Sequence, residues 1–317
     1  MWVPFIRRQI PVADAVTGYN ECRTAPQWAS PALAGGAVSV NSKRMDFEPV
    51  TPAIGAEVSD LDLRKPLSAA EQAELEAGLV AHGVLFFRDQ DIAPADHVRL
   101  AGYFGPARPH PAYPTVEGFP EITVLESDRE NPSKIEKWHT DMTFLQAPPL
   151  GSILRSRILP ETGGDTMWMS LGAAFDALEP ALQERLDGMR AEHSFAHGFR
   201  ESLAEPGGPE RLADAVAANP PVVHPVVRRH PVSGRRLLFV NSLFTTRVLD
   251  LDPEESEALL AELYAHLERE EFQVRLQWSE NTIAFWDNRQ TQHCPVNDYW
   301  PQHRRHERIT IEGDIPR

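Results

Sequence analysis

The sequence has only two cysteines among its 317 residues, Cys22 and Cys294, and they lie far apart in the chain. So few cysteines exclude a fold held together by disulfide bonds and are typical of a reducing compartment. No apolar run approaches the roughly 18 residues that a membrane-spanning helix needs. The N-terminal stretch MWVPFIRRQIPVADAV has no sustained apolar segment after its arginines, so we expect no signal peptide. These absences predict a cytoplasmic protein.

Positive charge is also scarce, because 31 lysine and arginine residues stand against 46 aspartate and glutamate residues. The formal net charge of −15 predicts a surface that repels nucleic acids and anionic membranes. We therefore expect neither as a partner. A small anionic substrate remains compatible with this charge if a local cluster of arginines overcomes the global field.

Residues 1–44 show no helical or strand period and are rich in alanine, proline, glycine and serine. This composition predicts a disordered N-terminal extension. It also fits an over-called upstream region, with Met45 as the true start. Residues 45–317 carry ordered hydrophobic patterns, which indicate a single domain.

The ordered part lacks the strand–helix alternation and glycine fingerprint of a dinucleotide-binding fold. Ser68 and Glu71 form a capping box, which predicts a helix that ends at Gly83. Further helices are predicted over 92–105, 170–189 (with a break near Pro180) and 252–269. Strands are predicted over 84–87, 151–158, 272–278, 282–287 and 308–314, with a hairpin that turns at Ser233-Gly234. This order favours an α+β, mainly β fold: a double sheet with helices packed outside.

The segment KWHTDMTF places His139 and Asp141 two positions apart, so in a strand both would point to one face. Alone, such a pair is typical of an exposed polar strand face. His293 follows an apolar strand and an Asp-Asn turn, a position that suits a ligand. Two histidines and one carboxylate form the facial triad of non-haem Fe(II) oxygenases. The same ligand types also hold zinc in hydrolases.

Arg304 and Arg308 follow His293 and would share one face of a strand, because they are four residues apart. Arginine binds carboxylates through a bidentate fork and stays charged when buried. An open metal site beside two such groups predicts an anionic cosubstrate and a small anionic substrate.

Four blocks, WHTDMTF, TGGDTMW, HPVVRRHPVSGRRLLFVN and WDNRQTQH with its two later arginines, resemble the taurine dioxygenase family of Fe(II)- and 2-oxoglutarate-dependent oxygenases. The resemblance runs from about residue 46 to 314. It implies a double-stranded β-helix (jelly-roll) core with flanking helices. It also implies Fe(II) as the metal, with 2-oxoglutarate and O2 as cosubstrates, and we expect a homo-oligomer.

The resemblance implies a role for each matching position, with no catalytic side chain beyond the metal ligands. The implied metal ligands are His139, Asp141 and His293. Thr166 and Arg304 would bind 2-oxoglutarate. The implied substrate contacts are His110, Tyr113, Ile135, Phe199, Phe244 and Arg308, the last of which would bind the sulfo group.

Three positions depart from the family pattern. Ile135 stands where the taurine enzymes have an asparagine that contacts the amine, and Gly198 stands where a serine is usual. Isoleucine cannot accept a hydrogen bond from an ammonium group, and burying that charge without a partner is costly. The change argues for an alkyl sulfonate or a sulfate ester at least as strongly as for taurine. Cys294 often corresponds to an aromatic residue in relatives and is interpreted as a small packed hydrophobe or an oxidation-prone thiol.

The implied reaction is hydroxylation of the carbon next to the sulfo group of a small sulfonate, either taurine or an alkyl sulfonate. It would release sulfite and an aldehyde, together with succinate and CO2. The alternatives are an alkyl sulfate ester dioxygenase (an alkylsulfatase) or a dioxygenase for another small organic acid. A different class is a jelly-roll metal binder without catalysis.

A chain that starts at Met45 should fold and turn over like the full chain, because residues 1–44 carry no pattern of a packed element. Thermal unfolding and the rate of succinate release check this for the two chains side by side. Loss of solubility or of turnover in the shorter chain would contradict the prediction.

Overall fold

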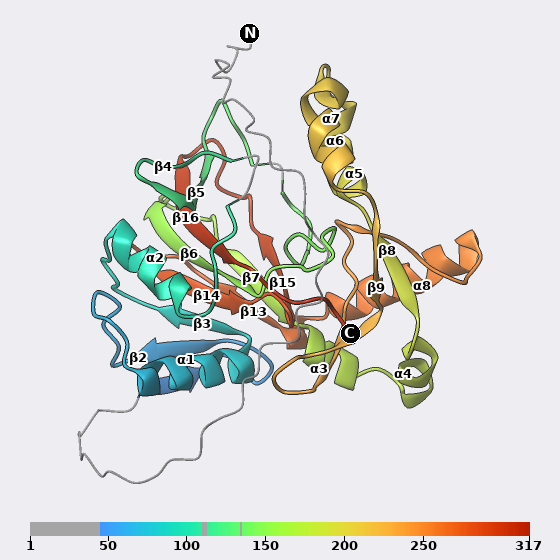
Figure 1. Ribbon diagram of the computed structural model, residues 1–317, viewed down its shortest axis with the longest axis horizontal. Coiled ribbons are helices and arrows are strands. Elements are labelled where there is room, and N and C mark those ends of the chain that lie inside the picture. The colour runs from blue at the N-terminus through green and yellow to red at the C-terminus, as the bar shows by residue number, and fades with distance from the viewer. Residues whose placement is uncertain (1–44, 110–112, 134) are drawn as a thin grey trace, which may run out of the picture. The chain divides into compact units, whose positions relative to one another are not determined.

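The computed structural model describes residues 45–109, 113–133 and 135–317 (Figure 1). Its largest element is an eight-stranded sheet with the order β1-β2-β3-β14-β6-β16-β5-β4. The strands of this sheet are β1 (Asp46–Pro49), β2 (Ala56–Ser59), β3 (Val84–Phe87), β4 (Thr115–Val116), β5 (Phe119–Ser127), β6 (Gly151–Ile158), β14 (Ile283–Asp287) and β16 (Arg304–Ile311). All neighbouring pairs are antiparallel except β2 and β3.

A second sheet has three strands in the order β13-β7-β15. Its bounds are β13 (Gln273–Leu276), β7 (Thr166–Ser170) and β15 (Thr291–Pro295). Two smaller sheets complete the fold: β12-β8-β9, with β12 (Thr245–Val248), β8 (Arg190–His193) and β9 (Val222–Pro225), and the hairpin β10 (Val227–Arg229) and β11 (Arg236–Leu238).

The large sheet and the β13-β7-β15 sheet enclose an aromatic core. Phe86 of β3 and Trp286 of β14 pack in one cluster with Trp168 of β7, and all three are buried. The Trp168 ring centroid lies 5.5 Å from that of Phe86 and 5.8 Å from that of Trp286. Side chains alternate along a strand, so the residues between them must face the other side of the sheet.

That other side is covered by helices α1 (Ala69–His82) and α2 (Pro94–Gly102), which lie against the large sheet in Figure 1. Leu85 and Phe285, the strand neighbours of Phe86 and Trp286, pack there with Leu79 of α1 and Leu100 of α2. The large sheet is therefore apolar on both faces, as a layer buried between helices and a second sheet must be.

The remaining helices follow the second half of the chain. They are α3 (Leu171–Asp176), α4 (Pro180–Leu186), α5 (Phe195–Gly198), α6 (Arg200–Ala204), α7 (Gly208–Ala218) and α8 (Pro253–Leu267), with a 3-10 turn over Glu270–Phe272. Buried side chains of α3, α8 and β11 form another core cluster. Within the described ranges, no helix combines the length and apolarity that a membrane span requires.

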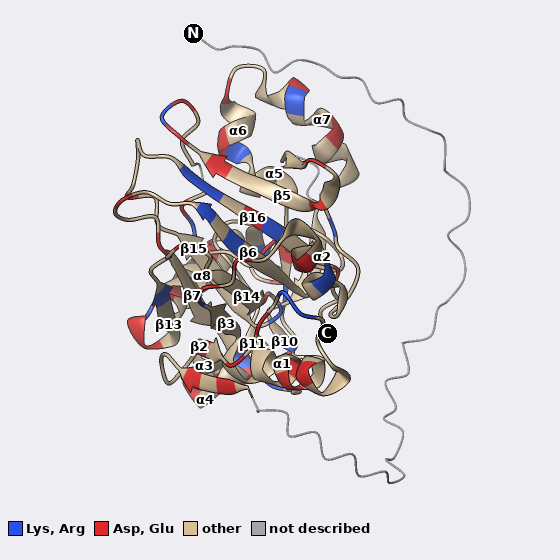
Figure 2. Cartoon of the chain, turned by 90° about the vertical axis from the view of Figure 1, so that its left-hand side faces the viewer, with Lys and Arg blue, Asp and Glu red and all other residues tan. Residues whose placement is uncertain are grey.

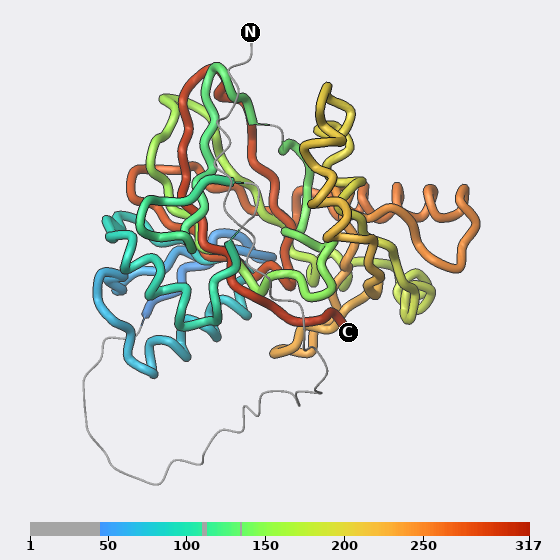
Figure 3. The backbone as a smooth tube through the Cα atoms, turned by 45° about the horizontal axis from the view of Figure 1, so that its top comes forward, coloured from blue at the N-terminus to red at the C-terminus, as the bar shows by residue number. Residues whose placement is uncertain are grey.

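The predicted helices and strands recur with shifted bounds. The capping box of Ser68 and Glu71 is present, and Gly83 ends α1 with a φ of 74°. Pro180 separates α3 from α4, and Gly234 turns the β10–β11 hairpin with a φ of 71°. The last strand begins at Arg304 rather than Arg308, so it carries both predicted arginines. Figure 3 shows this strand, in red, running beside the green segments β5 and β6.

Candidate metal centre and cosubstrate site

His139, Asp141 and His293 converge on one point. Their ligand atoms all lie within 4.8 Å of one another, and the three side chains are buried. The Asp141 Oδ1 atom lies 3.6 Å from His139 Nε2 and 3.9 Å from His293 Nε2. Two imidazole nitrogens and one carboxylate oxygen at these separations can bind a single metal ion from one side.

The backbone brings His139 to His293 by an isolated antiparallel bridge rather than by a regular strand. His139 N donates to His293 O at 3.1 Å, and His293 N donates to His139 O at 2.8 Å. After the bridge the chain turns, and Met142 has a φ of 50°. The expectation that His139 and Asp141 share one face of a strand is therefore wrong, because a turn aims the carboxylate at the imidazoles. His293 itself is the central residue of β15.

The pKa shifts of Asp141 and His293 suit the binding of a divalent cation. Burial would raise the pKa of Asp141, but Arg308 and His293 hold it well below 3.8. Burial and the neighbouring His139 lower the pKa of His293 to about 3. Lys137 O accepts a hydrogen bond from His139 Nδ1 at 2.8 Å, which leaves Nε2 as the basic nitrogen. One carboxylate and two imidazole nitrogens are a ligand set that fits Fe(II).

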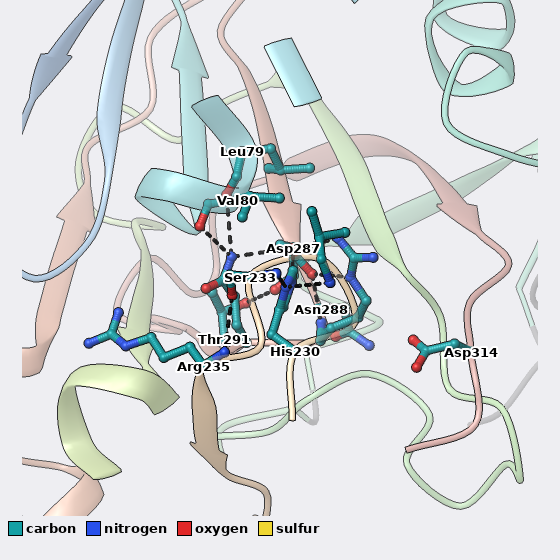
Figure 4. A network of polar contacts seen from close by, with 12 residues as sticks. Leu79, Val80, His230, Ser233, Arg235, Asp287, Asn288, Thr291 and Asp314 are labelled. Carbon is teal, nitrogen blue, oxygen red and sulfur yellow. Dashed lines mark hydrogen bonds and ion pairs between the residues drawn. The ribbon is translucent and has the colours of Figure 1, made fainter. Parts of the chain in front are cut away.

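Asn288 fixes the backbone of Asp141 from both sides. Its Oδ1 accepts from Asp141 N at 2.8 Å, and its Nδ2 donates to Asp141 O at 3.1 Å. Asn288 follows Asp287, whose carboxylate is buried between His230 at 2.9 Å and Arg289 at 2.8 Å (Figure 4). The buried ion pairs of Asp287 therefore fix the turn after β14, and Asn288 in that turn fixes the backbone of Asp141.

Arg308 contacts the triad directly. Its Nη1 atom lies 3.2 Å from each oxygen of Asp141, and its side chain is 9% exposed. Its Nε atom has no partner within the described part of the chain. Figure 2 shows basic residues on β6 and β16 in the middle of the large sheet, and Arg304 and Arg308 of β16 are among the buried ones.

Arg304 lies on the same face of β16 as Arg308 and is also buried. Its Nε donates to Gly164 O at 3.0 Å, and its Nη2 donates to Thr166 Oγ1 at 3.3 Å. Thr166 Oγ1 also accepts from Trp278 Nε1 at 3.0 Å. Because the hydroxyl oxygen accepts two hydrogen bonds, its own proton is available for an anion beside Arg304. A carboxylate would meet both a guanidinium and a hydroxyl here.

The structure places the other predicted substrate residues as follows. Tyr113 is close enough to Arg308 and Asp141 to interact with both electrostatically. The Phe244 ring centroid lies 6.4 Å from that of His139. Phe199 stacks on Phe195 at 4.3 Å between ring centroids. Ile135 is half-buried, and its backbone oxygen accepts from Asn297 Nδ2 at 2.8 Å. His110 lies outside the described residues, as does the predicted extension over residues 1–44.

Several residues of this site carry no signal that sequence reasoning used. The sequence predicts no role for Asn288 in holding Asp141 or for Trp278 in contacting Thr166; the Asp-Asn turn before His293 is the one local signal that involves Asn288. His306, between the two arginines of β16, was not singled out either. Cys294 is buried, and its thiol approaches the backbone oxygen of Glu136 at 3.6 Å, in agreement with a packed small residue.

Comparison with known proteins bears directly on this geometry. The family model described as "Taurine catabolism dioxygenase TauD, TfdA family" matches residues 46–310. The chain belongs to this family. It is 36% identical over 285 residues to an alpha-ketoglutarate-dependent sulfate ester dioxygenase of Pseudomonas putida, covering 88% of this chain and 93% of that protein. It is 35% identical over 278 residues to an alkylsulfatase of Acinetobacter baylyi, covering 86% of this chain and 87% of that protein.

A solved structure also resembles this chain in its fold. The crystal structure of a taurine dioxygenase from Burkholderia xenovorans superposes with a TM-score of 0.74 at 34% identity, covering 86% of this chain and 93% of that one. Family membership confirms the jelly-roll, α+β fold class. It also confirms an Fe(II)- and 2-oxoglutarate-dependent dioxygenase that uses O2, in a family that acts on sulfonates and sulfate esters.

Alanine at His139, Asp141 or His293 should abolish succinate formation while the fold persists, because each change would remove one of the three expected metal ligands. The visible charge-transfer band of anaerobic Fe(II) with 2-oxoglutarate should disappear as well, and circular dichroism checks the fold. His303→Ala is the matched control, since its imidazole is 43% exposed and pairs with Glu126. Near-normal succinate release from Asp141→Ala would refute the ligand assignment.

Proposed function

We propose that His139, Asp141 and His293 hold Fe(II), and that Arg304 and Thr166 bind the far carboxylate of 2-oxoglutarate. The support is the arrangement of two imidazoles and one carboxylate within 4.8 Å, with a buried arginine–threonine pair on the adjoining face. When bound, Fe(II) with 2-oxoglutarate and O2 supplies the power to convert a substrate C–H bond into C–OH, with succinate and CO2 as the coproducts. The protein supplies position and charge.

The substrate anion is assigned to Arg308. This guanidinium already contacts the metal-side carboxylate through Nη1, and its Nε is unpartnered within the described residues. A sulfo group bound to Arg308 would therefore lie near the triad and would bring the adjoining substrate carbon toward the metal. Tyr113 interacts electrostatically with Arg308 and Asp141, which supports a contact with the same anion.

An aromatic cluster supports an apolar chain on the other end of the substrate. Phe144 lies 5.1 Å from Phe244 and 5.1 Å from Phe195, measured between ring centroids, and all three rings are buried. Met142 completes this buried cluster, and Phe199 packs against it. Since the ring of Phe244 lies edge-on to that of His139, the cluster lies beside the proposed metal ligands. This contact carries the proposal of an apolar substrate.

Gly198 has a steric reason to lack a side chain. A Cβ atom built on it would lie 2.4 Å from the Phe244 ring, so a serine here would displace that ring. The usual polar contact of relatives is thus replaced by an aromatic surface. Together with Ile135, this replacement removes the polar groups that a substrate ammonium would need.

The favoured substrate is an alkyl sulfate ester. Hydroxylation of the carbon that bears the ester oxygen gives a product in which the hydroxyl proton leaves and the C–O bond to sulfate breaks. An aldehyde and sulfate are released. The names of the two relatives, a sulfate ester dioxygenase and an alkylsulfatase, favour this ester over taurine.

An alkyl sulfonate is the second candidate, because Arg308 would bind either sulfo group. In that case the C–S bond breaks after hydroxylation, and the products are an aldehyde and sulfite. The similarity to the solved structure of a taurine dioxygenase supports this second reaction. Ion chromatography of the released sulfate or sulfite distinguishes the two reactions.

Arg304→Ala should raise the 2-oxoglutarate requirement far more than the substrate requirement. Breaking a desolvated arginine–carboxylate pair costs on the order of 2–5 kcal/mol, which corresponds to roughly 30-fold or more. Steady-state kinetics with each ligand varied in turn measures the split. Arg305→Ala is the matched control, because Arg305 lies on the opposite face of β16 and pairs with Glu307. An unchanged 2-oxoglutarate dependence in Arg304→Ala would remove Arg304 from this role.

The enzyme should prefer a linear alkyl sulfate or alkyl sulfonate over taurine. A hydrogen bond to a charged group contributes about 1.5–3 kcal/mol, so taurine should lose roughly ten- to a hundred-fold in kcat/KM. Each buried CH2 of an alkyl chain gains about 0.8 kcal/mol against the aromatic cluster.

Ile135→Asn is the variant that tests this preference. It should improve taurine turnover relative to the alkyl substrate, as measured by succinate release across a substrate panel. A wild type that prefers taurine, with a ratio that Ile135→Asn leaves unmoved, would show that Ile135 does not line the pocket.

A further inference from the structure

His306 lies between the two arginines on the inward face of β16. Arg304, His306 and Arg308 occupy every second position of one strand, so their side chains point to the same side of the sheet. The imidazole is 0% exposed. It packs edge-on against Trp278, with 4.7 Å between ring centroids, and Trp278 itself donates to Thr166.

Neither nitrogen of this buried ring has a hydrogen-bond partner within the described part of the chain. Buried polar atoms are nearly always paired in native proteins, and each exception calls for an explanation. Among the described residues, every other buried side chain that lacks a hydrogen-bond partner lacks it at one atom, whereas His306 lacks it at two. Arg308 Nε, two residues further along the same face, is one of those single orphans. His306 and Arg308 thus both carry unpartnered atoms on the face of β16 that also carries Arg304.

The position of His306 relates these atoms to the cosubstrate. Arg308 touches the proposed metal ligand Asp141, and Arg304, four residues away on the same face of β16, forms the proposed carboxylate clamp. A molecule that binds the metal at one end and Arg304 at the other must pass along the face from which His306 projects. The ring is held beside the clamp, because its packing partner Trp278 is hydrogen-bonded to Thr166.

We propose that His306 donates a hydrogen bond to the far carboxylate of bound 2-oxoglutarate, as the third donor beside Arg304 and Thr166. This inference rests on the proposed function of those two residues. His306 would then help to determine which cosubstrate binds. Its hydrogen bond would strengthen the binding of a 2-oxo acid that has a second carboxylate and would not affect a 2-oxo acid that lacks one.

The charge state of the ring agrees with this role. Burial, with a further contribution from Arg304, holds the pKa of His306 well below 6.5. A neutral imidazole offers one N–H donor and one acceptor nitrogen. The donor matches a carboxylate oxygen, and the acceptor matches a hydroxyl or water. The ring thus adds a directed hydrogen bond without placing another full charge beside Arg304.

The test uses His306→Phe, which keeps a ring against Trp278 and removes both nitrogens. Anaerobic titration of the Fe(II)-loaded protein, followed by the charge-transfer band, measures the affinity for 2-oxoglutarate and for 2-oxopentanoate, which lacks the far carboxylate. We expect 2-oxoglutarate to bind about tenfold more weakly, because a hydrogen bond to a charged group is lost. Binding of 2-oxopentanoate should be unchanged, and His306→Gln should restore part of the difference.

Two further measurements separate a cosubstrate contact from a purely structural role. Without metal and cosubstrate, His306→Phe should unfold at a temperature at least as high as the wild type, since an unpaired buried polar group has been removed. His303→Phe, at an exposed histidine near the start of the strand, should leave the affinity for both acids unchanged. If His306→Phe fails to fold, His306→Leu serves in the same titration.

The outcomes are distinct. Equal weakening of both acids, or no change for 2-oxoglutarate, would overturn the role of His306. If Arg304→Ala also leaves 2-oxoglutarate binding unchanged, the proposed clamp itself is wrong. A loss with Arg304→Ala but none with His306→Phe would leave the clamp standing and reject this inference alone.

Discussion

An ionised carboxylate in the interior, that of Asp141, is the constraint on which the rest of the site depends. Burial opposes its charge, so the fold must surround it with compensating groups. Arg308 provides the opposite charge at 3.2 Å, and two imidazoles approach its oxygens. The backbone on either side is held by Asn288. His139 is two residues from Asp141, whereas Asn288, His293 and Arg308 lie near the C-terminal end of the sequence, so the site forms only when these two distant segments come together.

The turn after β14 illustrates how that requirement spreads outward. Asn288 can hold the Asp141 backbone only while the turn itself is rigid. Asp287 supplies the rigidity through buried pairs with His230 and Arg289. Gln290, in the same turn, donates to the backbone oxygen of Val80 in α1 at 3.1 Å. A helix on the outer face of the large sheet is thereby connected to the metal site on its inner face, through hydrogen bonds that are expensive to leave unmade.

The local charge at the site differs in sign from the net charge of the protein. The chain is strongly acidic, yet buried arginines line the inner face of β16. Buried guanidinium groups are costly unless they have anionic or polar partners. Arg308 meets Asp141, and Arg304 meets the Gly164 carbonyl and the Thr166 hydroxyl. An anionic ligand therefore finds donors that are already oriented, in surroundings where electrostatic interactions are little screened.

Residue types and their order in the sequence were enough to predict much of this protein. The His-x-Asp pair, the later histidine and the two arginines four residues apart predicted the chemistry of the site. The capping box at Ser68 and the glycine at 83 predicted the limits of the first helix. Such signals are local, because a cap or a hairpin turn depends on a few neighbouring residues.

Contacts between distant segments were decided by tertiary structure alone. The sequence could not show that a single bridge to His293, followed by a turn at Met142, aims Asp141 at the histidines. Nor could it show that Gly198 makes room for the Phe244 ring, or that His306 is buried without a partner. Periodicity along a chain reports which face a side chain takes, but not what packs opposite it. The three residues that cluster were therefore predictable from the sequence, whereas the orientation of their side chains toward one another depended on the packing of the sheets.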